Sequence, residues 1–339
     1  MERIINSITS PERLNSNWDH LAGFYFQKRE FLEHLHKHNP CQQRYYELYR
    51  NGIFVAGTIV YTLKLNILTF SNIPSPFIVT VIGIPVSVAT PPIIGDPDEF
   101  EYFLGEITEK ERGIILGINF LTDYLKDKVL NLRTLPTIIL KLKNKSFTDY
   151  EKALRHPYRR RLHQIRKKFM DVSSLTTGCS EFNQEHYALY LQIMKKTTTK
   201  LETLKYEIFK LLPSNFVLTS YYHDGTMICW HIVCRDKGVL FFFFGGMNYK
   251  YRDQFHAYNN NLLGISEFAF KEDYREIDFG QTAEIAKTRL GGQLSERRMF
   301  LYHKNKLVFG ILRLIRGFIN YSKTNKIPTV FKSELHPEL

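Results

Sequence analysis

The chain has 339 residues, of which 44% are apolar and 14% aromatic, and its 46 lysines and arginines against 34 aspartates and glutamates give a net charge of +12. This apolar content excludes a disordered chain, and the length is sufficient for two domain cores. The positive charge favours an anionic partner, such as a nucleic acid, an acidic membrane surface or a phosphate-bearing cosubstrate, without choosing among them.

Cysteine spacing and hydropathy exclude further classes. The cysteines at positions 41, 179, 229 and 234 form no C-x-x-C pair and are expected to be reduced thiols. No metal site is expected, because Cys229 and Cys234 would point to opposite faces of one strand. The most apolar segment, residues 76–95, contains four prolines and predicts strands and turns rather than a transmembrane segment. The chain start shows no signal segment, so we expect a cytoplasmic protein.

The first half of the chain predicts a helix followed by a β-hairpin. Residues 17–38 are rich in Phe, Leu and charge, as in an amphipathic helix. Within residues 47–63, Asn51-Gly52 separates a polar-aromatic strand from an apolar one. Both turn residues tolerate positive φ, which a two-residue hairpin turn requires.

The same order recurs in the second half. Residues 183–212 predict helices, and Asp224-Gly225 marks a second hairpin within residues 220–236. A helix followed by a hairpin and further strands, occurring twice, predicts two copies of one α/β domain with mixed sheets. The alternative is coincidence, since such turns are common.

The predicted domains are residues 1–145 and 146–321, followed by a loose polar tail over 322–339. Near the boundary, Thr148 to Glu151 resembles a capping box that opens a helix. Pro157 is expected to kink or restart that helix.

A basic helix is predicted over residues 155–168, which hold seven lysines and arginines and no acid. One interpretation is a solvated helix face, and the other is an anion-binding face for tRNA, a phospholipid or a nucleotide. The three contiguous arginines, residues 159–161, point around the helix rather than into one pocket.

Two predicted strands of the second half end in glycine. The buried strand 239–244 is followed by Gly245, Gly246 and Asn248, and the strand 274–280 ends in Gly280. A helix over 253–271 connects them, so a crevice is expected at their carboxyl ends, where ligands bind in open α/β sheets. The following residues offer a hydroxyl, a carboxylate and two cations, from Thr282, Glu284, Lys287 and Arg289.

The last predicted helix, residues 307–321, carries two adjacent apolar stripes. Val308, Leu312, Ile315 and Ile319 form one, and Leu307, Ile311, Leu314 and Phe318 form the other. We interpret it as a helix that packs the two domains together. The alternative is a helix that lies on an anionic membrane.

From about Ser146 to Leu301 the chain resembles the Fem-type and related acyltransferases of the GNAT superfamily. The resemblance rests on four segments in their order and spacing, namely YEKALRHPYRRRLHQIRKKF, DGTMICWHIV with the following GGMN, HAYNNNLLGISEFAF, and IDFGQT with KTRLGG. It implies two tandem GNAT-like domains, the first of them degenerate.

The resemblance also implies transfer of an acyl group to an amine of an amino sugar, an amino acid or a lipid-linked envelope intermediate. The donor would be acyl-CoA or, in the peptidoglycan branch, aminoacyl-tRNA, and no metal is implied. The expected catalytic residues are Lys287, Glu267 and Tyr258, with His256 and Glu284 as further candidates for a base. The expected donor-binding residues are Gly245, Gly246, Asn248, Gly280, Thr282, Arg289 and Gly291.

One departure from the family concerns the loop after Gly246. Common GNAT enzymes place a glycine-rich loop there, whose N–H groups hold the CoA pyrophosphate. Here the loop reads MNYKYRDQF without glycine, so an altered phosphate site is expected and the tRNA donor stays open. A third hypothesis is a non-catalytic protein that binds nucleic acid or contacts the inner face of an anionic membrane.

Overall fold

The computed structural model describes residues 2–39, 41–68, 76–86, 88–197, 202–322 and 327–332. The chain divides into two compact units. Unit 1 comprises Met1–Leu135, Thr198–Ile208 and Glu296–Lys323, and unit 2 comprises Pro136–Thr197, Phe209–Ser295 and Thr324–Leu339.

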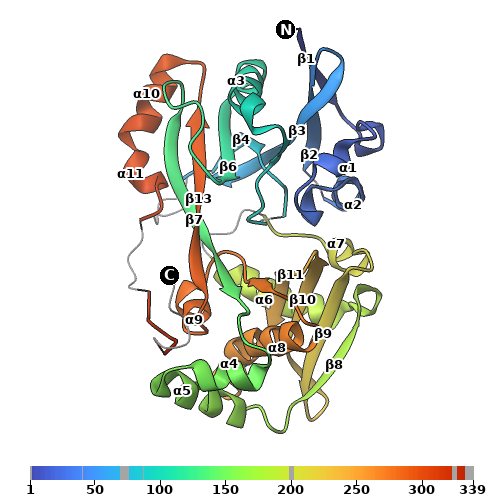
Figure 1. Ribbon diagram of the computed structural model, residues 1–339, viewed down its shortest axis with the longest axis vertical. Helices are drawn as coiled ribbons and strands as arrows, with labels where there is room; N and C mark the ends of the chain where they lie inside the picture. Colours follow the sequence, from blue (N-terminus) through green and yellow to red (C-terminus); the bar gives the residue numbers. More distant parts are fainter. Residues whose placement is uncertain are drawn as a thin grey trace. The chain divides into compact units, whose positions relative to one another are not determined.

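Unit 1 is built on a mixed sheet with strand order β1-β2-β3-β4-β6-β13, which the first part of β7 (Leu130–Lys141) continues beside β13. Strand β5 pairs separately with β3. Its strands are β1 (Arg3–Ile8), β2 (Gln42–Arg50), β3 (Ile53–Asn66), β4 (Pro76–Ile82), β5 (Ile93–Gly95), β6 (Ile114–Phe120) and most of β13 (Gln293–Tyr302). Its α-helices are α1 (Trp18–Leu21), α2 (Arg29–His38), α3 (Phe100–Lys110), α10 (Lys306–Leu314) and α11 (Arg316–Ile319), with short 3-10 turns at Pro11–Arg13, Tyr25–Gln27 and Pro97–Glu99 (Figure 1).

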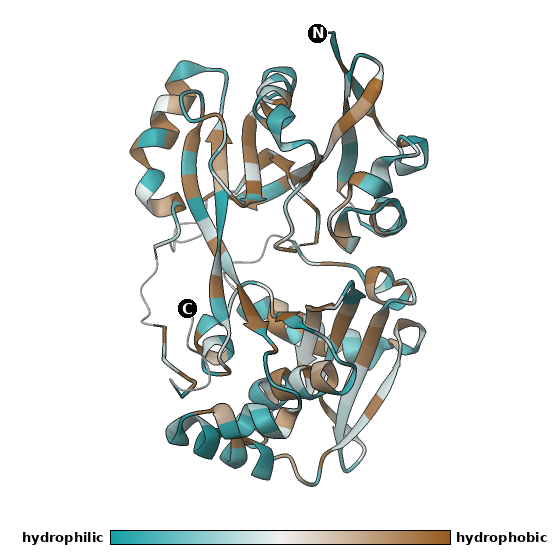
Figure 2. Ribbon diagram, viewed as in Figure 1, coloured by the Kyte–Doolittle hydropathy of each residue, from teal (hydrophilic) through white to brown (hydrophobic). Residues whose placement is uncertain are grey.

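The sheet of unit 1 has a core on each face, because alternate residues of a strand point to opposite sides. On one face, Phe103, Leu104 and Ile107 of α3 pack with strand residues such as Val60. On the other, residues of α10 and α11 pack with strand residues such as Val79. Figure 2 shows these apolar residues concentrated along the strands.

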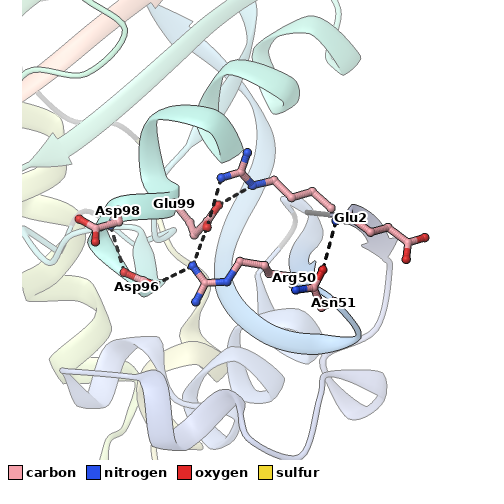
Figure 3. A network of polar contacts seen from close by, with 7 residues as sticks. Glu2, Arg50, Asn51, Asp96, Asp98 and Glu99 are labelled. Carbon is pink, nitrogen blue, oxygen red and sulfur yellow. Dashed lines mark hydrogen bonds and ion pairs between the residues drawn. The ribbon is translucent and has the colours of Figure 1, made fainter.

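The first hairpin forms as predicted. Asn51 and Gly52 have φ angles of 50° and 79°, and Arg50 pairs with Ile53 across the turn. An ion-pair network around the buried Glu99 fixes this end of the sheet (Figure 3). Glu99 accepts from Arg50 at 2.8 Å and pairs with Arg3 at 2.9 Å, so β1, β2 and the turn before α3 are joined.

Unit 2 has a mixed sheet with strand order β7-β12-β11-β10-β9-β8. The strands are β8 (Ser173–Gly178), β9 (Phe216–His223), β10 (Thr226–Asp236), β11 (Val239–Met247), β12 (Glu276–Asp278) and the second part of β7 (Leu130–Lys141). Its helices are α4 (Phe147–Ala153), α5 (His156–Lys167), α6 (Gln184–Lys196), α8 (Ala257–Lys271) and α9 (Glu284–Thr288), with a 3-10 turn at Cys179–Glu181, and α7 (Tyr206–Lys210) lies where the chain enters unit 2 (Figure 1).

Both units follow one order of elements. In unit 1 the antiparallel strands β2, β3 and β4 lead through α3 to β6, which pairs with β4 in parallel. In unit 2 the antiparallel strands β9, β10 and β11 lead through α8 to β12, which pairs with β11 in parallel. The predicted α/β fold with two similar halves is therefore confirmed.

The grouping of segments differs from the predicted one after residue 295. Residues 296–323 lie in unit 1 rather than in the second domain, because β13 pairs with β6, for example Leu301 with Leu116. The predicted loose tail also includes an ordered segment, residues 330–332. Arg155 N–H donates to the carbonyl of Val330 at 2.9 Å, and Lys332 N–H donates to that of Ala153 at 3.1 Å, so residues 330–332 dock on the α4–α5 junction.

Several helix ends differ from the prediction. Ser146, rather than Thr148, caps α4, since its hydroxyl accepts from Asp149 N–H at 3.1 Å. The helix expected from residue 253 begins at Ala257, after His256 in the left-handed region. The predicted first helix is divided into α1 and α2. α4 ends before α5 starts with Pro157 in its first turn.

The four cysteines are buried free thiols. In the part of the chain that the structure describes, no cluster of three His, Cys, Asp or Glu side chains suits a metal ion. No helix among the described residues has the length and apolarity that crossing a membrane requires.

Candidate active site

The strands β11 and β12 diverge in unit 2. They pair only from Val239 to Phe241 with Glu276 to Asp278. Beyond that point β11 remains paired with β10 as far as Met247. The chain after β12 remains hydrogen-bonded to β7, since Ile138 N–H donates to the carbonyl of Gly280 at 3.2 Å. In the described part of the chain, residues 244–247 of β11 therefore have no strand partner on the β12 side.

Gly245 and Gly246 lie inside β11 rather than beyond its end, which corrects the predicted strand end at residue 244. Gly246 pairs with Trp230 and Gly245 with His231. A Cβ at position 246 would lie 2.0 Å from the indole nitrogen of Trp230, whose N–H donates to the carbonyl of His186 at 2.9 Å. The bare backbone at 246 is thus required by the indole on that face.

A strained loop follows β12. Gly280, Thr282 and Ala283 all have positive φ, at 71°, 64° and 48°. A β-branched residue such as Thr rarely adopts this conformation, and such strain concentrates at functional sites. The carboxylate of Asp278 accepts from Gly280 N–H at 2.8 Å and from the Thr137 hydroxyl, so β7 holds the start of the loop.

The side chain of Lys287 anchors the loop that follows β12. Its side chain is buried, with 2% exposure, and its ammonium donates to the carbonyl of Gly280 at 3.1 Å and of Gln281 at 2.6 Å. Burial lowers the pKa of Lys287 to about 7, against the opposing effect of Asp278 and Glu284. The structure thus places the predicted residues Gly280 and Thr282 in one loop, and Lys287 of α9 binds that loop.

The other two predicted catalytic residues have different surroundings. Glu267 forms an ion pair with Arg166 of α5, which also binds Glu151 at 2.8 Å. Tyr258 is half-buried on α8 and packs against the core of unit 2, and its burial raises the pKa of the phenol. Neither side chain has a contact with Lys287 among the described interactions.

The remaining predicted donor-binding residues have structural partners or lie in solvent. The Asn248 side chain accepts from Lys250 N–H at 3.2 Å and so forms its own turn. Gly291, with a φ of 88°, leaves room for the Phe331 ring, which lies 2.4 Å from the place of its missing Cβ. Arg289 is exposed. Partial burial of the Arg161 guanidinium on α5 lowers its pKa, and the charge of Arg289 adds to this effect.

The loop between β11 and α8 carries cations and aromatic rings in place of glycines. Lys250 lies 5.1 Å above the ring of Tyr251. Lys196, from the end of α6, lies 4.6 Å above the ring of Tyr249, and Arg252 lies 5.8 Å from the same ring. This arrangement presents positive charge beside the unpaired part of β11.

Sequence reasoning missed two buried polar contacts of the site. Asp278, in the segment IDFG, could have been found as an acid two residues before the glycine that was predicted to end the strand. The Nδ1–H group of His231 donates to the Asn261 amide oxygen at 2.6 Å, and desolvation lowers the pKa of His231 to about 4. A histidine and an asparagine 30 residues apart gave no sequence signal of this contact.

Comparison with known proteins agrees with this geometry. Residues 158–288 match the family model described as an acetyltransferase (GNAT) domain. The chain carries a GNAT domain. It extends from α5 to α9 and contains the diverging strands, the loop at residue 280 and Lys287. The predicted relationship to the GNAT superfamily is thereby confirmed over residues 158–288.

Solved structures show the same fold over most of the chain. The structure of L-PGS from Bacillus licheniformis is 10% identical, with a TM-score of 0.51 over 87% of this chain and 94% of that one. The C-terminal domain of a putative lysylphosphatidylglycerol synthetase from Agrobacterium fabrum is 9% identical, with a TM-score of 0.50 over 78% and 85%. FemX is 11% identical, with a TM-score of 0.49 over 80% and 90%. No curated protein matches the sequence.

Proposed function

We propose that this chain is an N-acyltransferase that joins an acyl group to the amine of an amino sugar, an amino acid or a lipid-linked envelope intermediate. The observation that carries the proposal is the divergence of β11 and β12 after three paired residues, inside the GNAT domain. The N–H groups of an unpaired strand edge are fixed donors, which suit the oxyanion that forms when an amine attacks a carbonyl.

The reaction forms one bond and breaks another. The neutral amine nitrogen attacks the thioester carbonyl carbon, a C–N bond forms, and the C–S bond breaks as the thiolate leaves. The amine gives up one proton and the thiolate gains one, so the products are an amide and a thiol. Alignment of the amine with the carbonyl along the edge of β11 would supply much of the rate enhancement.

We assign Lys287 a positioning role in this reaction. Its ammonium already donates to two loop carbonyls and is withdrawn from solvent, so it holds Thr282 and Ala283 in their strained conformation instead of binding donor phosphates. Glu267, engaged by Arg166, would act as a base only after release from that ion pair. Tyr258, on α8, stays the candidate acid for the leaving group.

The proposed donor is acyl-CoA. The loop after Gly246 lacks the glycines that would hold the diphosphate by bare backbone, so we assign the diphosphate charge to Lys250 and Lys196. Arg252 is already paired with Asp253 at 2.7 Å. The thioester would then lie beside Gly245, where the β12 side of β11 is unpaired.

A second candidate donor is aminoacyl-tRNA, and one observation favours it. Along α5, Arg159, Arg160 and Arg161 form no ion pair among the described residues, and only Arg166 is neutralised. Figure 2 shows the hydrophilic character of this helix. An unneutralised cationic helix is suited to the phosphates of a polynucleotide.

The test is incubation of the purified chain with mixed acyl-CoAs and candidate amines, followed by mass spectrometry of the products. We expect a new amide with acyl-CoA and its loss in Lys287→Met, whereas the exposed control Lys271→Met keeps it. A product that appears only with charged tRNA would establish the second donor. No amide with either donor would contradict acyl transfer.

A further inference from the structure

The two apolar stripes along α10 and α11 have different surroundings. Leu312 and Ile319 are buried in the core of unit 1, with Ile315 packed beside them. Val79 and Leu301 of the sheet lie in the same cluster. One stripe therefore provides the attachment of the helix to its unit, and the second stripe is not needed for it.

The second stripe is in solvent. Leu307 is 80% exposed, Ile311 57%, Leu314 85% and Phe318 52%. Their spacing of four, three and four residues places them on one side of a helix. The backbone continues the helical course across Ile315, whose N–H donates to the carbonyl of Ile311 at 3.1 Å. A contiguous row of large apolar side chains marks a surface that contacts another apolar phase.

The charges around this stripe are all positive. From Lys304 to Tyr321 the sequence contains Lys304, Lys306, Arg313 and Arg316 and no acidic residue. Arg313 lies 4.6 Å above the ring of Phe309, and the three cations at positions 306, 313 and 316 form no ion pair among the described residues. Figure 2 shows brown and teal residues interleaved along α10.

The exposed apolar stripe and the cations beside it favour an anionic bilayer over a protein partner. A helix that lies in a membrane interface has an apolar face in the acyl region and Lys or Arg at the headgroups. Each cation near an anionic surface adds to the attraction. The rim of a protein interface is polar, whereas cations without any acidic residue complement a surface that is uniformly anionic.

We propose that α10 and α11 dock this protein on the surface of an anionic membrane, with Leu307, Ile311, Leu314 and Phe318 inserted among the acyl chains. This goes beyond acyl transfer and does not depend on it. The docking surface belongs to unit 1, whereas the candidate active site belongs to unit 2.

The experiment is co-sedimentation of the full chain with vesicles of phosphatidylcholine alone or mixed with phosphatidylglycerol. We expect binding to the mixed vesicles that weakens with salt. The variant Leu307→Ser/Leu314→Ser should bind at least about tenfold more weakly, because two inserted side chains are lost. Its matched control, Ile53→Ser/Leu121→Ser, removes two exposed apolar side chains of unit 1 elsewhere and should bind like the natural chain.

Charge and self-association are tested in the same assay. Lys306→Gln/Arg313→Gln should reduce the preference for phosphatidylglycerol while the apolar stripe stays intact. Equal vesicle binding by the Leu307→Ser/Leu314→Ser variant and the natural chain would overturn the proposal. A dimer in light scattering that this variant abolishes, without any vesicle binding by the natural chain, would overturn it in favour of a second copy of the chain.

Discussion

The indole of Trp230 occupies the space that a side chain at Gly246 would need. A Cβ at position 246 would meet Nε1 of the indole at 2.0 Å, whereas a Cβ at position 245 would meet the carbonyl oxygen of Trp230 at 3.0 Å. The two adjacent glycines therefore differ in what they do. Gly246 is a packing residue, and Gly245 lies on the stretch of β11 that we assign to the acyl donor.

Substitution should separate the two glycines. Gly246→Ala should lower the free energy of unfolding by about 2–4 kcal/mol, because the indole is fully buried and cannot move without losing its hydrogen bond. Gly245→Ala should cost less stability and should lower activity. Denaturant unfolding and the amide-forming assay measure both. In the double variant Gly246→Ala/Trp230→Leu we expect a loss smaller than the sum of the single losses, and additive losses would contradict the clash.

The buried Lys287 should make stability depend on pH above neutrality. Its pKa is lowered from 10.5 to about 7 in the folded chain, so between these values the unfolded chain binds the additional proton, and stability rises with pH. Between pH 7 and 9 we expect the natural chain to gain about 2–3 kcal/mol relative to Lys287→Met, as measured by urea unfolding at each pH. Parallel curves for the two proteins would show that Lys287 stays charged when folded.

Buried histidines should make the fold sensitive to acid. The pKa values of His34, His186 and His231 are lowered from 6.5 to about 4, mainly by desolvation. Their contribution to stability is complete above pH 6.5 and is lost as pH falls to 4, because only the unfolded chain takes up these protons. His231→Gln should reduce the loss at pH 4 by up to about 3 kcal/mol. The exposed His36→Gln should leave the acid loss unchanged, and an equal effect of both variants would contradict the role of burial.

The strain at Thr282 should be separable from its function. Glycine adopts a φ of 64° without steric cost, so Thr282→Gly should leave the unfolding free energy unchanged or raise it by up to about 1 kcal/mol. We expect kcat to fall nonetheless, because the loop at the end of β12 would lose its fixed conformation. Asp273→Gly relieves a similar positive φ away from this loop, and it should leave kcat at the value of the natural chain. A fall of kcat in both variants would contradict a special role for the loop.

Local signals in the sequence predicted the elements that depend on local chemistry. The hairpins at Asn51-Gly52 and Asp224-Gly225 form because their turn residues accept positive φ. The apolar segment from residue 76 contains strands as expected, because its prolines exclude a continuous helix. The sequence also singled out Gly280 and Lys287 as site residues, which stays a prediction, and the Lys287 ammonium binds the carbonyl of Gly280.

Features that depend on long-range packing were not visible in the sequence. Trp230 and Gly246 meet only because β10 and β11 pair in one register. The ion pair of Glu267 with Arg166 depends on α5 lying beside α8. The two stripes of the last helix are chemically alike, so no sequence pattern could decide which of them would face the sheet.

The pairing of β13 with β6 has a consequence for how the protein can be made and cut. During synthesis, the β6 edge must wait for a partner that emerges about 180 residues later, so the amino-terminal half leaves the ribosome with an open strand edge. A fragment that stops at residue 145 would keep that edge permanently and should self-associate. A separately expressed first half should therefore include residues 296–323.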